Sequence, residues 1–181
     1  MESARLYTRP EVPCPIFVAA SGPKTAETAG RLCDGLITPA APAEKLKTLI
    51  ESFEKGVREA GKEPSTMPKL LQLHVSWADT YDEAAQQAMK EWPNGGIKAP
   101  KQDIRSPEDF AAFGQLVRPE DFKGRVFIST DLEEHRRHLQ SFYDLGFDEV
   151  HVHNVGLNQT EFIRAYGEVV IPALHGKDAQ A

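Results

Sequence analysis

Apolar residues occur along this chain in two kinds of segment, short continuous runs and longer stretches with helical spacing. Residues 14–20 (CPIFVAA) are apolar without alternation, which indicates a strand buried on both faces. Pro23 then suits the first turn of a helix. A second helix is predicted over 43–60, where Gly61 is a suitable stop. Its apolar positions are Leu46, Leu49, Ile50, Phe53 and Val57.

The same alternation of strand and helix continues to the end of the chain. Further strands are predicted over 34–38, 69–78, 125–130 and 148–155, and further helices over 80–91, 131–146 and 160–174. Two of these helices follow capping-box sequences, Thr80–Glu83 and Thr130–Glu133. The last helix is predicted to present one apolar face, formed by Phe162, Ile163, Tyr166, Val169, Val170 and Leu174.

One stretch breaks this rhythm and is interpreted as an insertion. Residues 92–123 are punctuated by Gly and Pro, with one short helix expected to start at Ser106-Pro107. Residues 175–181 are expected to be a loose tail. The alternating order predicts an α/β domain over 1–181, with a parallel sheet and helices packed outside it. An eight-unit barrel needs about 250 residues, so the chain provides either a small open sheet or about half a barrel.

Composition excludes several classes of protein. The 181 residues include 40% hydrophobic and 27% charged residues, with a net charge of −6. The absence of a basic stripe argues against a nucleic-acid partner, and the apolar runs are too short to span a membrane. The first ten residues lack the apolar core of a signal peptide. Cys14 and Cys33 form no disulfide framework. We therefore expect a cytoplasmic protein.

The turn after the first strand has the features of an anion site. Ser21, Gly22, Lys24 and Thr25 span the end of the strand and the first turn of the helix. Free backbone N–H groups and the helix dipole favour an anion there. Gly22 lets a phosphate approach the backbone, Lys24 adds charge and Thr25 adds a hydroxyl. An ordinary strand–helix turn is the alternative.

The histidines give a weaker signal. His151 and His153 share one face of the last strand, and two histidines at this spacing bind zinc only if a third ligand converges. The sequence fixes no third ligand, so we expect no metal site. One of the two is expected to line a barrel mouth. His74 is expected to face the same way as Gln72 and Ser76, whereas His135 and His138 lie on a charged helix and are predicted to be solvated.

Two long segments resemble a known family. Residues 4–38 (ARLYTRPEVPCPIFVAASGPKTAETAGRLCDGLIT) and 125–174 (RVFISTDLEEHRRHLQSFYDLGFDEVHVHNVGLNQTEFIRAYGEVVIPAL) resemble the luciferase-like, coenzyme F420-dependent oxidoreductases, and most closely their glucose-6-phosphate dehydrogenase-like branch. The resemblance covers nearly the whole chain. It implies the C-terminal half of a (β/α)8 TIM barrel, strands five to eight. The acid/base histidine and glutamate of the family belong to the other half, so no catalytic residue is assigned here.

The resemblance also implies ligands for two groups of residues. The four positions of the Ser21–Thr25 turn match those that contact the phosphate-bearing tail of the deazaflavin. Thr38, Lys101 and Arg125 match a threonine, a lysine and an arginine that hold the sugar phosphate, a role that suits both cation types. A second family lysine is missing near Ala41, which puts glucose 6-phosphate itself in question.

Two hypotheses follow. The chain is part of an F420-dependent oxidoreductase, supplying the cofactor-phosphate clamp and part of the pocket for a small substrate; a flavin mononucleotide (FMN) enzyme of the same superfamily is a lesser alternative. Otherwise it is a non-catalytic half-barrel that binds a phosphate-bearing ligand or itself. In either case the first and last strands of a half-barrel have unpaired edges. These edges predict a homodimer, or pairing with a matching N-terminal half-barrel.

Overall fold

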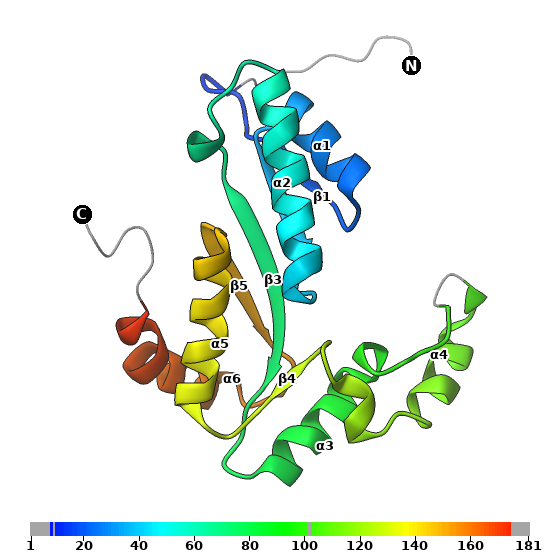
Figure 1. The fold of residues 1–181 in the computed structure, drawn as a ribbon. Helices are drawn as coiled ribbons and strands as arrows, with labels where there is room; N and C mark the ends of the chain where they lie inside the picture. The colour runs from blue at the N-terminus through cyan, green and yellow to red at the C-terminus, as the bar shows by residue number, and fades with distance from the viewer. Residues whose placement is uncertain (1–7, 9, 101–102, 175–181) are drawn as a thin grey trace.

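A single parallel sheet organises the chain. The computed structural model describes residue 8 and residues 10–100 and 103–174, so Lys101 and the expected tail lie outside the described residues (Figure 1). Within the described part the sheet contains β1 (Phe17–Ala19), β2 (Gly35–Pro39), β3 (Lys69–Ser76), β4 (Phe127–Ile128) and β5 (Glu149–Asn154). Strands β1, β2, β3 and β5 lie in this order, all parallel. The predicted α/β fold with a parallel sheet is confirmed.

Strand β4 is shorter than the sequence predicts. Val75 of β3 pairs with Phe127 of β4 and with Asn154 of β5. Because a strand has two edges, β4 lies on the edge of β3 opposite β5, beyond the end of β2. The expected strand over 125–130 reduces to two residues, because Arg125 and Val126 bond back to Phe122 in a turn. Ser129 makes one further bond to β3, from its N–H to the Ser76 carbonyl, while its hydroxyl accepts from Asp131 at the next helix cap.

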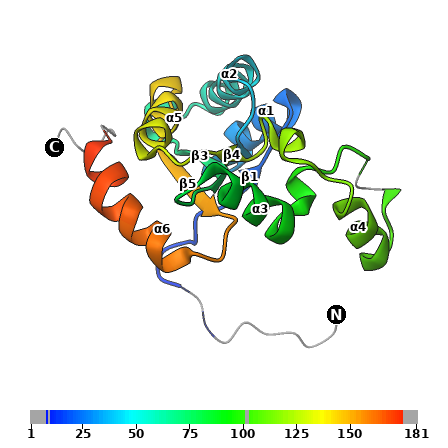
Figure 2. The same ribbon diagram turned by 90° about the horizontal axis from the view of Figure 1, so that it is seen from below.

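Three of the helices, α1, α2 and α5, form a layer on one face of the sheet (Figure 2). The helix bounds are α1 (Pro23–Leu32), α2 (Ala43–Glu59), α3 (Tyr81–Glu91), α4 (Pro107–Gly114), α5 (Leu132–Leu145) and α6 (Gln159–Ala165). Figures 1 and 2 show α1, α2 and α5 together on one side of the sheet, with α4 projecting away from it. Among the described helices, none has the length and apolar character needed to cross a membrane.

The main hydrophobic core lies between this helix layer and the sheet. Leu36, Leu71, Leu73 and Val75 of the strands are almost fully buried. They belong to one cluster with residues from α2 and α5, including Leu46, Leu49, Phe53, Val57, Leu139 and Phe142. The predicted apolar spacing of residues 43–60 therefore identifies the buried side of α2 correctly.

The opposite side of the sheet, which we call the open face, is much less covered. Pro39, Gln72 and His151 are register partners on β2, β3 and β5, and all three are exposed. Ala19 of β1 is exposed as well. In a closed barrel, side chains on this face would fill the interior. Here they are exposed, as expected for the inner face of part of a barrel wall.

The insertion is held by a second, smaller core. Ala88, Phe122, Val126 and Val155 form a buried cluster under α3. Ser106 caps α4 through the backbone N–H of Asp109, which confirms the short helix predicted after it. Short 3-10 turns lie at Pro64–Thr66, Pro93–Gly95 and Pro119–Phe122.

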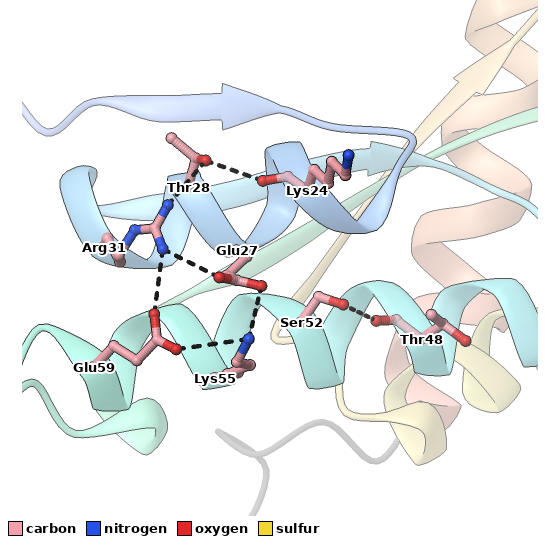
Figure 3. Close-up of polar contacts among 8 residues, drawn as sticks. All are labelled: Lys24, Glu27, Thr28, Arg31, Thr48, Ser52, Lys55 and Glu59. Atoms are coloured by element: carbon pink, nitrogen blue, oxygen red, sulfur yellow. Dashed lines mark hydrogen bonds and ion pairs between the residues drawn. The ribbon is translucent and has the colours of Figure 1, made fainter.

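Helices α1 and α2 pack at backbone contact. A Cβ atom added to Gly56 would lie 2.0 Å from the carbonyl oxygen of Glu27, and one added to Gly30 would lie 2.1 Å from that of Phe53. Figure 3 shows the polar rim of this crossing, where Glu27, Arg31, Lys55 and Glu59 form ion pairs of 3.1–3.6 Å. The two glycines determine how closely α1 and α2 approach, because exposed ion pairs contribute little to stability.

His135 is buried, so the prediction that it is solvated is wrong, and His138 is half-buried. His135 is 1% exposed; its Nε2 lies 3.1 Å from the Ser129 carbonyl and its Nδ1 lies 2.6 Å from the Tyr166 hydroxyl. His138 stacks on Phe127. Both histidines lie on the side of α5 that meets β4 and the end of the chain. Of the charged residues beside them in sequence, Glu133 and Arg137 are exposed, whereas Glu134 accepts a hydrogen bond from the Ser129 hydroxyl at 2.6 Å.

The last helix is also less uniform than predicted. Phe162, Tyr166 and Val170 are buried at a spacing of four residues, but Ile163 and Val169 are 65% and 50% exposed. The chain continues from α6 into a π-helical turn, Tyr166–Val170, and then a 3-10 turn, Ile171–Ala173. The apolar face predicted for this helix therefore includes residues that are exposed in this chain.

The α1–α2 crossing makes a direct stability prediction. We expect Gly56→Ala to reduce the free energy of unfolding by about 1–3 kcal/mol, because the new methyl group meets the backbone of α1. Gly167→Ala is a matched control, since its Cβ would meet nothing within 4 Å, and we expect it to be neutral or slightly stabilising. Urea unfolding measures both. Equal stability of the two variants would contradict this account of the crossing.

The buried His135 predicts a dependence of stability on pH. Burial lowers the pKa of His135 below its ordinary value and has the same effect on His138. The unfolded chain therefore binds protons more readily, so stability should fall as the pH drops below about 6.5. Each extra proton bound by the unfolded chain costs about 1.4 kcal/mol per pH unit.

Urea unfolding between pH 7.5 and 5 measures this effect. His135→Gln keeps a donor and an acceptor at the site, and it should reduce the loss of stability on acidification. His151→Gln, at an exposed position, should leave the loss unchanged. An unaltered pH dependence in His135→Gln would show that His135 is not its source.

Candidate functional site

A cavity opens on the open face near the carboxyl ends of β2 and β3. Its volume is about 540 Å³. Gln72 and His74 of β3 form one wall and Ala40 after β2 forms a second. Trp92, at the start of the predicted insertion, and Arg125, just after its end, complete the cavity. In parallel α/β sheets, ligands bind outside the carboxyl ends of the strands. This cavity is therefore the first candidate for a substrate pocket.

Two histidines and a tryptophan pack together beside this cavity. His74 and His153 are register partners on β3 and β5, and their Nδ1 atoms lie 2.9 Å apart. The Trp92 ring lies 5.3 Å from the His74 ring and 4.8 Å from the His153 ring, between centroids. The alternation of β3 was correctly interpreted for His74 and Gln72. Ser76 follows the same alternation along β3, and it is fully buried and donates to the Ala84 carbonyl at 2.7 Å.

Arg125 joins the cavity to the insertion. Its Nη1 donates to the carbonyl oxygens of Ile97 at 2.6 Å and Gly95 at 3.3 Å. These bonds hold the guanidinium against the loop after α3. The guanidinium has five N–H donors, so these two bonds leave it with capacity for a ligand in the cavity. Arg125 thus has a structural role that the sequence did not reveal.

The structure does not bring the three predicted phosphate ligands together. Thr38 is 1% exposed, and its hydroxyl donates to the Pro39 carbonyl at 3.4 Å. It pairs in register with the core residue Leu71 and is not among the residues that line the cavity. Lys101 lies outside the described residues. Of the three, Arg125 lines the cavity, and the roles of all three as phosphate ligands remain predictions.

A second, apolar cavity of about 530 Å³ lies between α2 and α5. Leu73, Phe127, Phe142 and Leu145 contribute to its lining, together with Ala41. Arg125 and Ala40 line both cavities. Ala41, near which the resemblance implies a missing lysine, therefore adds apolar surface to this cavity.

The predicted anion-binding turn lies where β1 meets α1. Gly22 caps α1 in an extended conformation with φ of −138°, followed by Pro23. Ser21, Lys24 and Thr25 are exposed. The first free backbone N–H groups of α1 belong to Lys24 and Thr25, because proline has none and the N–H of Ala26 bonds to Gly22.

The space around this turn is open. A Cβ atom added to Gly22 would meet nothing within 4 Å, so room for a ligand exists next to the backbone. Figure 3 shows Lys24 at the end of α1 that is distant from the ion pairs of Arg31 and Glu59. Within the described part of the chain, the Lys24 ammonium makes no ion pair. The turn therefore combines an accessible cation, accessible amides and unfilled space.

No group of three or more metal-ligating side chains (His, Cys, Asp or Glu) lies close enough to hold an ion among the described residues.

Sequence analysis did not identify Trp92, the residue that packs against both histidines. It stands at the start of the irregular insertion, where no periodicity identifies a buried position. The contact between His74 and His153 depends on β5 pairing with β3, which spacing along the chain does not show.

Comparisons with known proteins identify the family and agree with the fold. Residues 2–149 match the family described as Luciferase-like monooxygenase. The F420-dependent glucose-6-phosphate dehydrogenase of Nakamurella multipartita is 32% identical over 176 residues, which is 96% of this chain and 52% of the relative. That of Microbacterium testaceum is 29% identical over 181 residues, covering 99% of this chain and 54% of the relative.

Solved structures show the same relationship. An F420-dependent secondary alcohol dehydrogenase, in complex with an F420-acetone adduct, superposes with a TM-score of 0.81 at 31% identity, covering 95% of this chain and 52% of that one. An F420-dependent tetrahydromethanopterin reductase from Methanopyrus kandleri shares the fold, with a TM-score of 0.70 at 19% identity. The chain spans about half the length of these relatives. It belongs to the luciferase-like family, and its similar relatives are F420-dependent enzymes.

Proposed function

We propose that this chain is part of an F420-dependent oxidoreductase that acts on an alcohol. The observation that carries the proposal is the open, cation-bearing turn at Gly22, at the same edge of the sheet as the cavity beside Arg125. The relatives named above are F420-dependent dehydrogenases of a sugar phosphate or of a secondary alcohol. A cofactor site and a substrate cavity at one edge are what such an activity requires.

The turn fits a phosphate group of the cofactor. A phosphate next to Gly22 would accept hydrogen bonds from the backbone N–H groups of Lys24 and Thr25. The Lys24 ammonium would add charge and the Ser21 and Thr25 hydroxyls further donors, since all three side chains are exposed. These donors would bind FMN phosphate equally well, so the preference for F420 is supported by the relatives.

The cavity supports a small alcohol as substrate. Among the described residues, Arg125 is the cation that lines it, and Trp92, Ile97 and Ala40 supply apolar surface. A sugar phosphate would be expected to need more positive charge than Arg125 alone. With Ala41 in place of a lysine and Thr38 buried, the described residues favour an uncharged alcohol. A sugar phosphate is the alternative, in which Lys101 would join Arg125.

F420, when bound, supplies the hydride-transfer chemistry. The chain's own residues would hold its phosphate at the Gly22 turn and place the substrate between Gln72, Trp92 and Arg125. The side chain of Trp92 and the loop fixed by Arg125 would shield one side of the substrate from water. Water exclusion strengthens the electrostatic interactions within such a site.

The open face supports a proposal about assembly. Among the described residues β1 pairs only with β2, and β5 only with β3, so the sheet has two open edges. Exposed edges and an exposed inner face invite another chain. We propose that a second half-barrel covers this face, either a second copy of the chain or a matching (β/α)4 half. A non-catalytic half-barrel that binds a phosphate ligand or itself is the alternative function.

Cofactor binding at the turn can be tested directly. Titration of the chain with oxidised F420, followed by the cofactor's absorbance, should show saturable binding. Gly22→Ala should weaken it at least about tenfold, because the methyl group occupies the space next to the backbone, without loss of stability. Lys24→Gln should weaken it about threefold to tenfold, and less at high salt.

Lys47→Gln is the matched control, since Lys47 is an exposed lysine of α2 paired with Glu44. It should bind F420 as the unmodified chain does. Equal affinity of Gly22→Ala and Lys47→Gln for F420 would place the cofactor elsewhere.

Addition of a secondary alcohol or of glucose 6-phosphate to the chain with bound F420 then tests turnover. Binding without reduction by either would favour the non-catalytic half-barrel.

The assembly has its own test. Sedimentation velocity at micromolar concentration should show a dimer or a larger species. Ala19→Glu places a charge on the open face and should shift the chain toward monomer, because assembly would bury that charge. Ala60→Glu introduces the same charge at the exposed end of α2 and should have no effect. A monomer in all three samples would exclude self-association and leave a matching half as the partner.

A further inference from the structure

We propose that the apolar cavity between α2 and α5 holds the alkyl chain of the alcohol substrate, while the hydroxyl group lies in the cavity beside Gln72 and Trp92, here called the substrate cavity. The substrate class is then a secondary alcohol with a chain of several carbon atoms. This inference deepens the proposed function and rests on it. It is carried by a gap in the sheet, by the residues that line both cavities and by the position of the Arg125 charge.

The two cavities lie on opposite faces of β3 at the same level. Leu73 lines the apolar cavity, whereas its neighbours Gln72 and His74 line the substrate cavity. Successive side chains of a strand point to opposite faces of the sheet, so the sheet itself separates the two cavities. A ligand that occupies both must therefore pass an edge of β3.

The sheet has a gap at this edge. Strand β2 pairs with β3 as far as Gln72, and β4 pairs with the same edge of β3 from Val75 onward. Leu73 and His74 lie between these two positions and, within the described part of the sheet, have no register partner on β2 or β4. Three residue steps along a strand span about 10 Å. The gap thus offers a passage from one face of the sheet to the other.

Small residues border this gap. Ala40 follows β2, Gly124 and Arg125 precede β4, and all three line both cavities. A Cβ atom added to Gly124 would meet nothing within 4 Å, so the space beside its backbone is open. The φ of Gly124 is +74°, a left-handed conformation that favours glycine over residues with a side chain. The backbone conformation therefore keeps this side of the gap free of a side chain.

Arg125 directs its charge away from the apolar cavity. Its Nη1 donates to the carbonyl oxygens of Gly95 at 3.3 Å and Ile97 at 2.6 Å. Both of these residues line the substrate cavity, and neither is among those that line the apolar cavity. The guanidinium therefore lies on the side of the substrate cavity, and the apolar stem of Arg125 is the part that borders the gap.

The apolar cavity suits hydrocarbon in lining and in size. Its large apolar side chains are Leu73, Phe127, Phe142 and Leu145. Its polar groups are already partnered or neutral: the Ser141 hydroxyl donates to the His138 carbonyl at 2.6 Å, and burial lowers the pKa of His138, so its ring is neutral at pH 7.5. Cavities with such a lining bind apolar molecules. The volume of about 530 Å³ is within the range of ligand pockets, about 300–1,000 Å³.

The apolar cavity can be tested in the chain without cofactor and without turnover. Titration with 2-butanol, 2-hexanol and 2-octanol, followed by NMR, should show an affinity that rises about fourfold for each added methylene group, because each leaves water. Nuclear Overhauser effects should join the terminal methyl group of 2-octanol to Phe142, and the methyl group next to its hydroxyl carbon to Trp92. Equal affinity for the three alcohols, or contacts of both methyl groups with one cavity alone, would overturn the inference.

Two variants reduce the apolar cavity from different sides. Ala41→Phe fills it from the segment before α2 and Ser141→Phe from α5. Each should reduce the ratio of the affinities for 2-octanol and 2-butanol at least about tenfold. Ala60→Phe, at the exposed end of α2, is the matched control and should keep the unmodified ratio. Urea unfolding verifies that each variant is folded, and an unchanged ratio in a folded cavity variant would contradict the assignment.

The link to the reaction has a separate test. With F420, kcat/KM of the unmodified chain should rise from 2-butanol to 2-octanol, and Ala41→Phe should remove most of this rise. Turnover that does not depend on chain length would overturn the inference while the proposed function stands. Failure of the unmodified chain to bind F420 would instead remove the proposed function, whatever the affinities for the alcohols.

Discussion

All strands of the sheet run in the same direction, and this constraint places every candidate site of the molecule. Because the strands are parallel, the ends of β1, β2, β3 and β5 meet at one edge. The Gly22 turn, the cavity beside Arg125 and the histidine pair all depend on that edge or on the open face next to it. With antiparallel strands, residues this far apart in sequence would lie at opposite edges.

The sequence predicted the parts of the fold that repeat. The apolar spacing of residues 43–60 identified α2 and its buried side, and the alternation on β3 placed His74 beside Gln72. Prediction from the sequence failed where the burial of a residue depends on a contact with a distant part of the chain. His135 lies on a charged helix, yet it is buried because Tyr166, from the end of the chain, packs against it. No local pattern contains such a contact.

The candidate site could be predicted only in part for the same reason. The Gly22 turn is local, since strand, glycine, proline and helix follow one another directly. The cavity is built from β3, the two ends of the insertion and the end of β2, and its shape depends on Arg125 reaching Ile97. Trp92 had no periodic signal. Pairing of His74 with His153 follows from the order of the strands in the sheet, which spacing along the chain does not show.

The contact of α1 with α2 has a consequence for the energetics of ligand binding. Gly30 and Gly56 let the two helix backbones touch, so α1 has little freedom to tilt or slide. The backbone amides at its first turn are therefore held in a fixed direction before any ligand arrives. Binding to amides that are already oriented loses little conformational entropy. In this molecule, the residues that would preorganise the candidate anion site lie on the side of α1 that faces α2, and they need never touch a bound anion.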